Sequence, residues 1–135
     1  TLSLAETKEI SLSLKAEREI LKKVKTSDSV VLGPGISQHP ETQKLILRLI
    51  LKIDKPMVLD ADALNAISKN VSLLKKIKSS YVITPHPGEM SRLIKKEIKY
   101  VKNHRLIVAK KFSHDYNAVV VLKGAGTVVA EPSGK

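Results

Sequence analysis

Four short apolar runs, rich in β-branched residues, stand out along the chain, and a polar segment follows each of them at once. The runs cover residues 30–32, 57–59, 81–83 and 118–122. Nearly unbroken apolar stretches of this length are typical of strands buried on both faces of a parallel sheet. Amphipathic stretches separate them, so the pattern predicts an α/β fold in which strands and helices alternate.

The stretches between these runs show helical spacing of their apolar positions. Helices are predicted over residues 15–25, 40–53, 62 onward, 73–77, 87–94 and 98–114, and residues 1–12 predict a short strand or two. Right-handed crossovers between the parallel strands predict a three-layer, doubly wound, mostly parallel sheet with helices on both faces. The turn at 124–126 leads directly into 127–130, which we interpret as the antiparallel partner of the fourth strand.

The two ends of the chain lack complete units of this pattern. No full βα unit precedes the first apolar run, and the chain stops soon after the hairpin. We therefore expect residues 1–135 to form a single partial α/β domain, the central part of a longer one, incomplete at both ends.

Composition removes several classes of site. The chain has no cysteine, which excludes disulfides, thiolate metal sites and a cysteine nucleophile. Only 3% of the residues are aromatic, so the core must consist of Ile, Leu, Val and Ala. No apolar stretch approaches the roughly 20 residues of a membrane helix, and no signal peptide is visible. We expect a cytoplasmic protein without membrane contact.

The formal net charge of +11 raises the question of a nucleic-acid partner. Basic surfaces gain affinity for nucleic acids by releasing counterions from the phosphates. Here the lysines are spread over the predicted helix faces, aromatic residues for base stacking are scarce, and no nucleic-acid-binding motif is present. We expect no nucleic-acid partner, and we expect the charge to attract a phosphorylated small molecule.

The polar segments that follow the four strands predict one ligand site. Because the carboxyl ends of parallel strands lie at the same edge of a sheet, these segments should form a single rim, which is where open α/β sheets bind ligands. The segments are GPGIS at 33–37, DADALN at 60–65, TPHPGEM at 84–90 and KGAGT at 123–127.

The segment TPHPGEM is the most informative of the four. Two prolines stiffen it, and His86 between them can donate, accept or titrate. Gly88 permits a close backbone approach, and Glu89 falls in the first turn of the following helix, where a carboxylate suits the helix dipole. The alternative interpretation is a capped turn with a surface histidine.

The other three segments leave more alternatives open. GPGIS is neither a P-loop nor a dinucleotide fingerprint and also suits a tight turn. Asp60, Asp62 and Asn65 could hold hydrated Mg²⁺, orient a substrate hydroxyl or cap a helix. KGAGT suits the phosphates or ribose of a nucleotide, or a plain hairpin turn. The remaining histidines (His39, His104 and His114) show no metal-ligand spacing and are interpreted as surface or helix-face residues.

Taken together, GPGIS, DADALN, TPHPGEMSRL and VVVLKGAGT, in this order and spacing, resemble the NAD(P)H-hydrate dehydratase family. The resemblance covers about residues 28–130. It implies a ribokinase-like fold and a hydro-lyase that phosphorylates the added hydroxyl of hydrated NADH or NADPH and then eliminates phosphate. It also implies an adenine nucleotide with Mg²⁺, and TPHPGE and KGAGT look like the ADP-dependent form rather than the ATP-dependent one.

The resemblance also implies roles for individual residues. The substrate-binding residues would be Gly35, Asp60, Asn65, His86, Glu89 and Arg92. The nucleotide-binding residues would be Lys123, Gly124, Ala125, Gly126 and Thr127. The metal ligands are not implied.

Two departures from the family pattern bear on function. Ser37 stands where family members often have glycine. The family's Gly-Thr-Gly-Asp segment, which carries the catalytic aspartate, would lie beyond Lys135, so the chain alone should lack the base that activates the hydroxyl and should be inactive. We expect it to associate with further copies of itself or with the remaining part of the same enzyme. Two alternatives are a kinase of the same fold acting on a vitamin-precursor alcohol and a non-catalytic nucleotide-binding or nucleic-acid-associated module.

Overall fold

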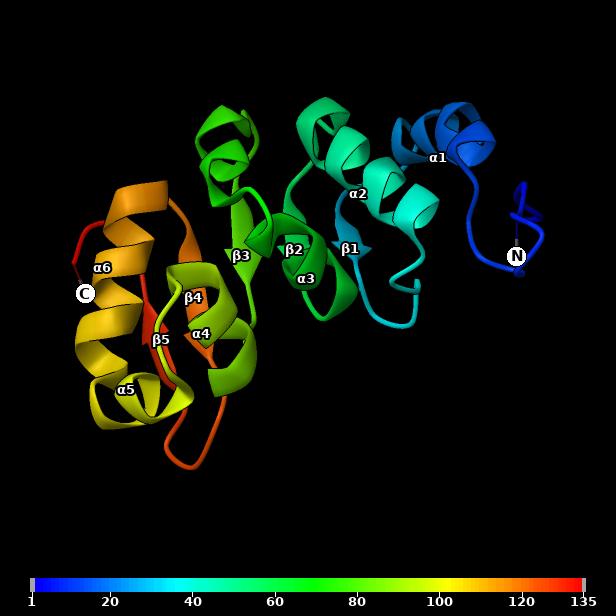
Figure 1. Cartoon of the computed structure of the whole chain (residues 1–135). Coiled ribbons are helices and arrows are strands. Elements are labelled where there is room, and N and C mark those ends of the chain that lie inside the picture. The colour runs from blue at the N-terminus through cyan, green and yellow to red at the C-terminus, as the bar shows by residue number, and fades with distance from the viewer. Residues whose placement is uncertain (1, 135) are drawn as a thin grey trace.

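A computed structural model of the chain describes residues 2–134 and shows a five-stranded sheet lined by helices (Figure 1). The strands are β1 (Val30–Leu32), β2 (Met57–Leu59), β3 (Tyr81–Ile83), β4 (Val119–Leu122) and β5 (Val128–Ala130). The α-helices are α1 (Glu17–Val24), α2 (Pro40–Lys52), α3 (Asp62–Ser68), α4 (Pro87–Ile94), α5 (Ile98–Asn103) and α6 (Arg105–Tyr116), and two 3₁₀-helices are η1 (Leu14–Ala16) and η2 (Val71–Lys76).

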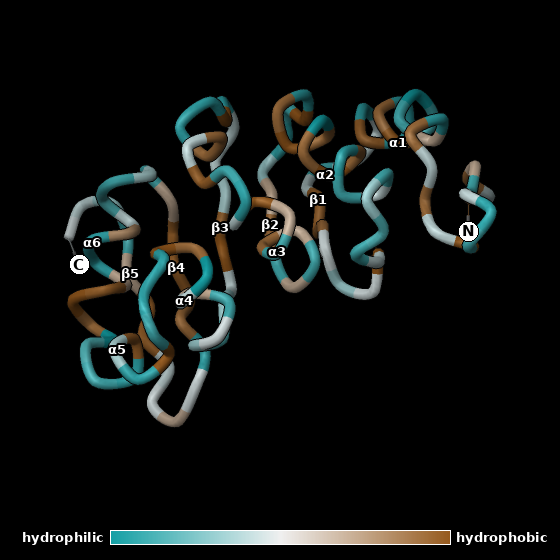
Figure 2. The backbone as a smooth tube through the Cα atoms, viewed as in Figure 1, coloured by the Kyte–Doolittle hydropathy of each residue, from teal (hydrophilic) through white to brown (hydrophobic). Residues whose placement is uncertain are grey.

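The strands lie in the sheet in the order in which they follow one another along the chain. β1 to β4 are parallel neighbours, and β5 returns antiparallel beside β4. The four apolar runs are thus confirmed as parallel strands and residues 128–130 as the hairpin partner. Figure 2 shows hydrophobic residues concentrated along these strands.

The helices of the described residues lie on one face of the sheet. Helices α2, α3 and α4 pack in a row, and Glu17 of α1 accepts hydrogen bonds from Arg48 (2.6 Å) and Lys52 (2.5 Å) of α2. Strand residues on this side, such as Leu59 and Ile83, are fully buried.

The opposite face of the sheet presents a row of valines. Val31, Val58, Val82 and Val119 are aligned across the parallel strands, and Val121 pairs with Val129 of β5. The exposed fraction is 66% for Val31 and 61% for Val129. We call these six residues the valine face.

The α/β class and the mostly parallel sheet are confirmed, whereas the expectation of helices on both faces does not hold for residues 2–134. A doubly wound sheet requires the strand order to reverse. Here the order never reverses, and right-handed connections between consecutive strands place every connecting helix on the same face.

Three predicted elements differ from the structure, the first being the helix predicted over 73–77, which is the 3₁₀-helix η2. The single helix predicted over 98–114 is broken at His104, whose backbone leaves helical geometry (φ −127°, ψ 33°) and whose ring stacks on Tyr100. The strands predicted in residues 1–12 reduce to one antiparallel bridge between Glu6 and Leu12. This segment is held instead by side chains of α2, since Thr42 Oγ1 donates to the Leu12 carbonyl (2.7 Å).

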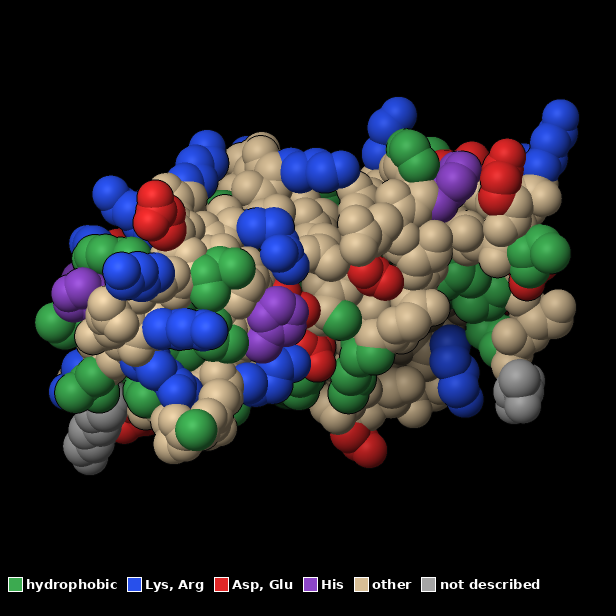
Figure 3. All heavy atoms as spheres, turned by 60° about the horizontal axis from the view of Figure 1, so that its bottom comes forward, with side chains coloured by type: hydrophobic (Ala, Val, Ile, Leu, Met, Phe, Trp, Pro, Cys, Tyr) green, Lys and Arg blue, Asp and Glu red, His purple; other side chains and the backbone are tan. Residues whose placement is uncertain are grey.

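The surface of the described residues matches the expected spread of charge. Lysine and arginine side chains lie scattered across the face viewed in Figure 3. None of the helices in residues 2–134 has the length and apolar character needed to cross a membrane.

Helix α2 offers a direct test of the buried core. Ile50 is fully buried, whereas its neighbour Leu51 has an exposed fraction of 39%. We expect Ile50→Ala to lower the free energy of unfolding by about 2–5 kcal/mol, because it leaves a cavity that the packed core fills only in part. Leu51→Ala, the matched control, should cost about 1 kcal/mol or less. Urea denaturation of both variants measures the difference, and equal losses would contradict this description of the core.

Candidate functional site

The four polar loops form one continuous rim at the carboxyl edge of the sheet, as the sequence predicts. Backbone hydrogen bonds join each loop to its neighbour: Asp60 N–H donates to the Leu32 carbonyl (3.1 Å), Thr84 N–H to Leu59 (3.2 Å) and Lys123 N–H to Pro85 (2.8 Å). On the molecular face that holds this edge, acidic, basic and histidine side chains lie side by side (Figure 3).

The first loop depends on glycine for its close packing. Gly33 has φ +125°, and a Cβ added there would lie 1.8 Å from the Asp60 carbonyl oxygen. Gly35 (φ +69°) has open space where a side chain would be. Ser37 also has a positive φ of 96°, which explains why glycine suits this position.

A chain of side-chain hydrogen bonds runs from this loop across α3 to α4. Ser37 N–H donates to Asp62 Oδ2 (3.0 Å), and Asn65 Nδ2 donates to Asp62 Oδ1 (3.3 Å). Arg92 Nη2 then donates to Asn65 Oδ1 (2.9 Å). Asn65 and Arg92 are therefore brought together as predicted. Asp62 holds the Asn65 side chain in place by accepting its hydrogen bond.

The second loop holds an ion pair and a strained backbone. Asp60 Oδ1 accepts from Lys123 Nζ (2.8 Å) and from the Ala61 N–H (2.9 Å). Ala61 itself adopts φ 48°, ψ −116°, which is sparsely populated by residues with a side chain. The helix-capping alternative is wrong for Asp60 and Asp62, because the N-cap residue of α3 is Ala61, and no side chain at that position makes a capping hydrogen bond.

The electrostatics of Asp60 favour its ionised form. Burial acts to raise the pKa of its carboxyl, but hydrogen bonds from Lys123, the Ala61 N–H and Thr84, with the charge of Lys123, outweigh it. The net effect is a pKa below the ordinary value of an aspartate. The Asp60 carboxyl thus remains ionised at neutral pH.

In the third loop, His86 and Glu89 hold each other in place. His86 Nδ1 accepts from the N–H groups of Gly88 (3.0 Å) and Glu89 (3.3 Å), and Glu89 Oε2 accepts from the His86 N–H (2.8 Å). This is the capping box of α4, so the capped-turn interpretation is confirmed. Because Nδ1 accepts, we assign the proton of the neutral ring to Nε2, which lies 3.4 Å from Glu89 Oε1.

The imidazole ring of His86 remains accessible to solvent although it caps the helix. The side chain of His86 has an exposed fraction of 51%, while Glu89 beneath it is buried. Gly88 leaves room for the ring, since a Cβ there would lie 2.9 Å from His86 Cε1. The capping box thus fixes the His86 ring, while about half of the side chain stays accessible at the rim.

The fourth loop is held by a contact that was not predicted from the sequence. Arg105, the first residue of α6, donates to the carbonyls of Ala125 (Nη1, 2.7 Å) and Leu122 (Nη2, 3.0 Å). Arg105 lies within the stretch predicted as one continuous helix, whereas the structure places it at the start of α6, directly after the break at His104. Thr127 Oγ1 donates to the Gly124 carbonyl (3.2 Å).

The remaining histidines lie apart from this rim chemistry. His39 caps α2 by accepting from the Glu41 N–H (3.3 Å), His104 breaks the helix before α6, and His114 is exposed. Within residues 2–134, no three His, Cys, Asp or Glu side chains group in a way that could hold a metal ion.

The whole chain matches a known protein family. A family model described as NAD(P)H-hydrate dehydratase matches residues 2–135. The bifunctional NAD(P)H-hydrate repair enzyme Nnr of Moorella thermoacetica is 39% identical over all 135 residues, which are 26% of its length. The Escherichia coli enzyme of the same name is 44% identical over 104 residues, 77% of this chain and 19% of that one. The chain therefore spans about a quarter or less of these relatives.

Solved structures agree on the fold. The ADP/ATP-dependent NAD(P)H-hydrate dehydratase of Bacillus subtilis, co-crystallised with ATP/Mg²⁺, superposes with a TM-score of 0.64 at 32% identity, covering 79% of this chain and 36% of that one. A ribokinase-like superfamily protein of Enterococcus faecalis gives a TM-score of 0.69 at 19% identity, covering 87% and 41%. The ribokinase-like fold predicted from the sequence is confirmed.

The Asp60–Lys123 pair predicts a pH dependence of stability. Because the folded pKa of Asp60 lies below its unfolded value, the contribution of this carboxylate is complete above the unfolded pKa of about 3.9 and is lost as the pH falls through the folded pKa. The difference in unfolding free energy between wild type and Asp60→Asn should be constant from pH 7 to 5 and shrink below about pH 4.

Urea denaturation at each pH measures this difference. Asp54→Asn, which removes an exposed carboxylate without an ion pair in residues 2–134, is the matched control and should show no such trend. A difference for Asp60→Asn that stays the same down to pH 2 would contradict the role of the pair.

Proposed function

The chain belongs to the NAD(P)H-hydrate dehydratase family, and we propose that it supplies the substrate- and nucleotide-binding rim of an enzyme that repairs hydrated NADH or NADPH. The observation that carries this proposal is the link between the loops proposed to bind the substrate and the loop proposed to bind the nucleotide. The Asp60–Lys123 ion pair joins the loop after β2 to the loop after β4, so that His86 and the KGAGT loop border one edge.

The proposed reaction has two steps. The added hydroxyl of the hydrate attacks the terminal phosphorus of ADP or ATP, gives up its proton to a base and forms a phosphate ester, and the shortened nucleotide leaves. The C–O bond of the ester then breaks with loss of a ring proton, which releases inorganic phosphate and restores the dihydronicotinamide double bond. No group in residues 2–134 is assigned as the base.

His86 and its neighbours are proposed to bind the hydrated cofactor. The Nε2–H of the ring is a directed donor, and its direction is set by the capping box beneath it. Gly35 offers open space and an unshielded backbone across the rim. Asn65 and Arg92, tied together at 2.9 Å, add a cation and an amide on the α3–α4 side, and buried Glu89 serves by holding His86.

The KGAGT loop is proposed to bind the adenine nucleotide, with ADP as the preferred phosphoryl donor. The loop offers two glycines at positive φ and backbone amides close to the Asp60–Lys123 pair. Asp60 and Asp62 already accept hydrogen bonds within the rim, which leaves few free carboxylate oxygens in residues 2–134. We therefore propose that Mg²⁺ enters with the phosphates of the nucleotide, keeping several of its waters.

The activity test uses a protein of the length of the relatives that carries this sequence. It is incubated with hydrated NADPH, Mg²⁺ and either ADP or ATP, and the return of the dihydronicotinamide absorbance is followed. A return that requires the nucleotide, faster with ADP than with ATP, is expected. Nucleotide binding without any return would overturn the proposal in favour of a kinase of the same fold.

A substitution at His86 separates its cap from its ligand role. Asn is among the best N-cap residues, so His86→Asn should keep helix α4 and change the free energy of unfolding by no more than about 1 kcal/mol. The same change removes the Nε2–H donor. Repair activity should fall about tenfold or more, since one lost hydrogen bond of about 1.4 kcal/mol is a factor of ten.

The control for this variant is His114→Asn, because His114 is exposed at the far end of α6. It should leave both stability and activity unchanged. An active His86→Asn protein would remove the imidazole from the proposed substrate site.

A further inference from the structure

Arg105 spans the KGAGT loop from the side. Its guanidinium donates to the Ala125 carbonyl at 2.7 Å and to the Leu122 carbonyl at 3.0 Å, and these two residues lie on either side of Lys123 and Gly124. A planar guanidinium can hold two acceptors in a fixed relation, which a lysine ammonium cannot do.

The guanidinium also occupies the space beside Gly124. A Cβ added to Gly124 would lie 2.8 Å from Arg105 Nη1 and 3.0 Å from Nη2, and the glycine has φ +147°. Glycine at this position and arginine at the start of α6 therefore fit one another. Gly126 (φ +67°), by contrast, has no atom within 4 Å of an added Cβ and faces open space.

These contacts leave the loop with occupied acceptors and free donors. The carbonyls of Leu122, Gly124 and Ala125 all accept hydrogen bonds from Arg105 or Thr127. The N–H groups of Gly124, Ala125 and Gly126 donate to no other residue in the described range 2–134. Successive free backbone amides favour an oxygen-rich, anionic ligand.

The charge of Arg105 adds to this preference. Lys123, the other cation of the loop, is paired with Asp60 at 2.8 Å, whereas Arg105 contacts no carboxylate within residues 2–134. Its Nε is buried and lacks a hydrogen-bond partner among these residues, which costs stability. A buried donor left unpaired in this way calls for an explanation beyond folding.

We propose that Arg105 is a positioning residue for nucleotide binding. It holds the carbonyls of the KGAGT loop, so that the amides of residues 124–126 stay free for the oxygens of the nucleotide, and it supplies a positive charge that the protein does not neutralise. The inference rests on the proposed function, in which this loop binds ADP or ATP.

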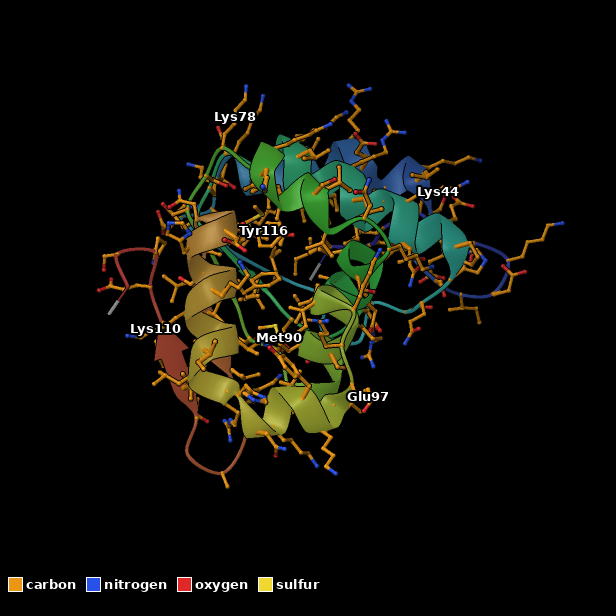
Figure 4. The ribbon with its side chains drawn as sticks, turned by 60° about the vertical axis from the view of Figure 1, so that its left-hand side comes forward. Lys44, Lys78, Met90, Glu97, Lys110 and Tyr116 are labelled. Carbon is orange, nitrogen blue, oxygen red and sulfur yellow. The ribbon has the colours of Figure 1, made fainter. Side chains whose placement is uncertain are left out.

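The test uses a protein of the length of the relatives that carries this sequence, and compares its variants by isothermal titration calorimetry with ADP. Arg105→Ala should weaken ADP binding at least tenfold, and Arg105→Lys should fall between, since one ammonium cannot bridge both carbonyls. Lys110→Ala is the matched control, because Lys110 is an exposed cation on the same helix. Its side chain extends outward from α6 (Figure 4). The affinity of this variant should equal that of wild type.

Two further readouts exclude a merely structural effect. In steady-state assays the KM for the nucleotide should rise while the KM for the hydrate stays constant. In hydrogen exchange, the Lys123 amide, which donates to Pro85, should exchange faster in Arg105→Ala while the exchange of the sheet core is unchanged.

The outcomes separate this inference from the proposed function. Wild-type protein that binds neither ADP nor ATP would overturn the proposed function, and the nucleotide-binding role of Arg105 with it. Wild type that binds ADP alongside an Arg105→Ala variant of equal affinity would overturn the inference alone. If Arg105→Ala fails to fold, Arg105→Lys decides instead: weaker ADP binding in a folded protein supports the role of the two-carbonyl contact, and unchanged binding overturns it.

Discussion

The rim of this protein depends on one interaction between residues far apart in the chain, the ion pair of Asp60 and Lys123. The two side chains come from loops after β2 and β4, and they meet across the loop after β3. Backbone hydrogen bonds join neighbouring loops of the rim, and this ion pair adds a side-chain link between the loop after β2 and the loop after β4, which are not neighbours. Burial alone would disfavour the Asp60 carboxylate, and the hydrogen bonds from Lys123 and from the N–H of the strained Ala61 offset that cost.

The fold was largely predictable because its signals are local. Four β-branched runs separated by helical periodicity specify parallel strands, and the glycines before 128–130 specify the hairpin. The rim followed from the rule that the carboxyl ends of parallel strands share one edge. The capping box of His86 and Glu89 is also a local pattern, which is why its residues could be identified before their geometry was known.

Features that depend on relations across the sheet were not predictable in the same way. Whether helices lie on one face or both depends on strand order, which no periodicity encodes. The contact of Arg105 with the loop after β4 follows a break in the helix at His104, a single residue whose non-helical backbone the apolar spacing of 98–114 does not signal. Asp62 supports Asn65 and Ser37 rather than capping α3, because Ala61 turns the chain into a conformation that sequence propensity would not choose.

The valine face has a consequence for whatever packs against it. Valine side chains are β-branched and restricted at χ1, so Val31, Val58, Val82 and Val119 present a surface with little rotamer freedom before it is covered. A layer that packs there removes apolar area from water while freezing few side-chain torsions, unlike a surface of leucine or methionine. The valine face therefore loses little side-chain conformational entropy when another layer packs on it. Most of the entropy loss on association falls on the side chains of that layer.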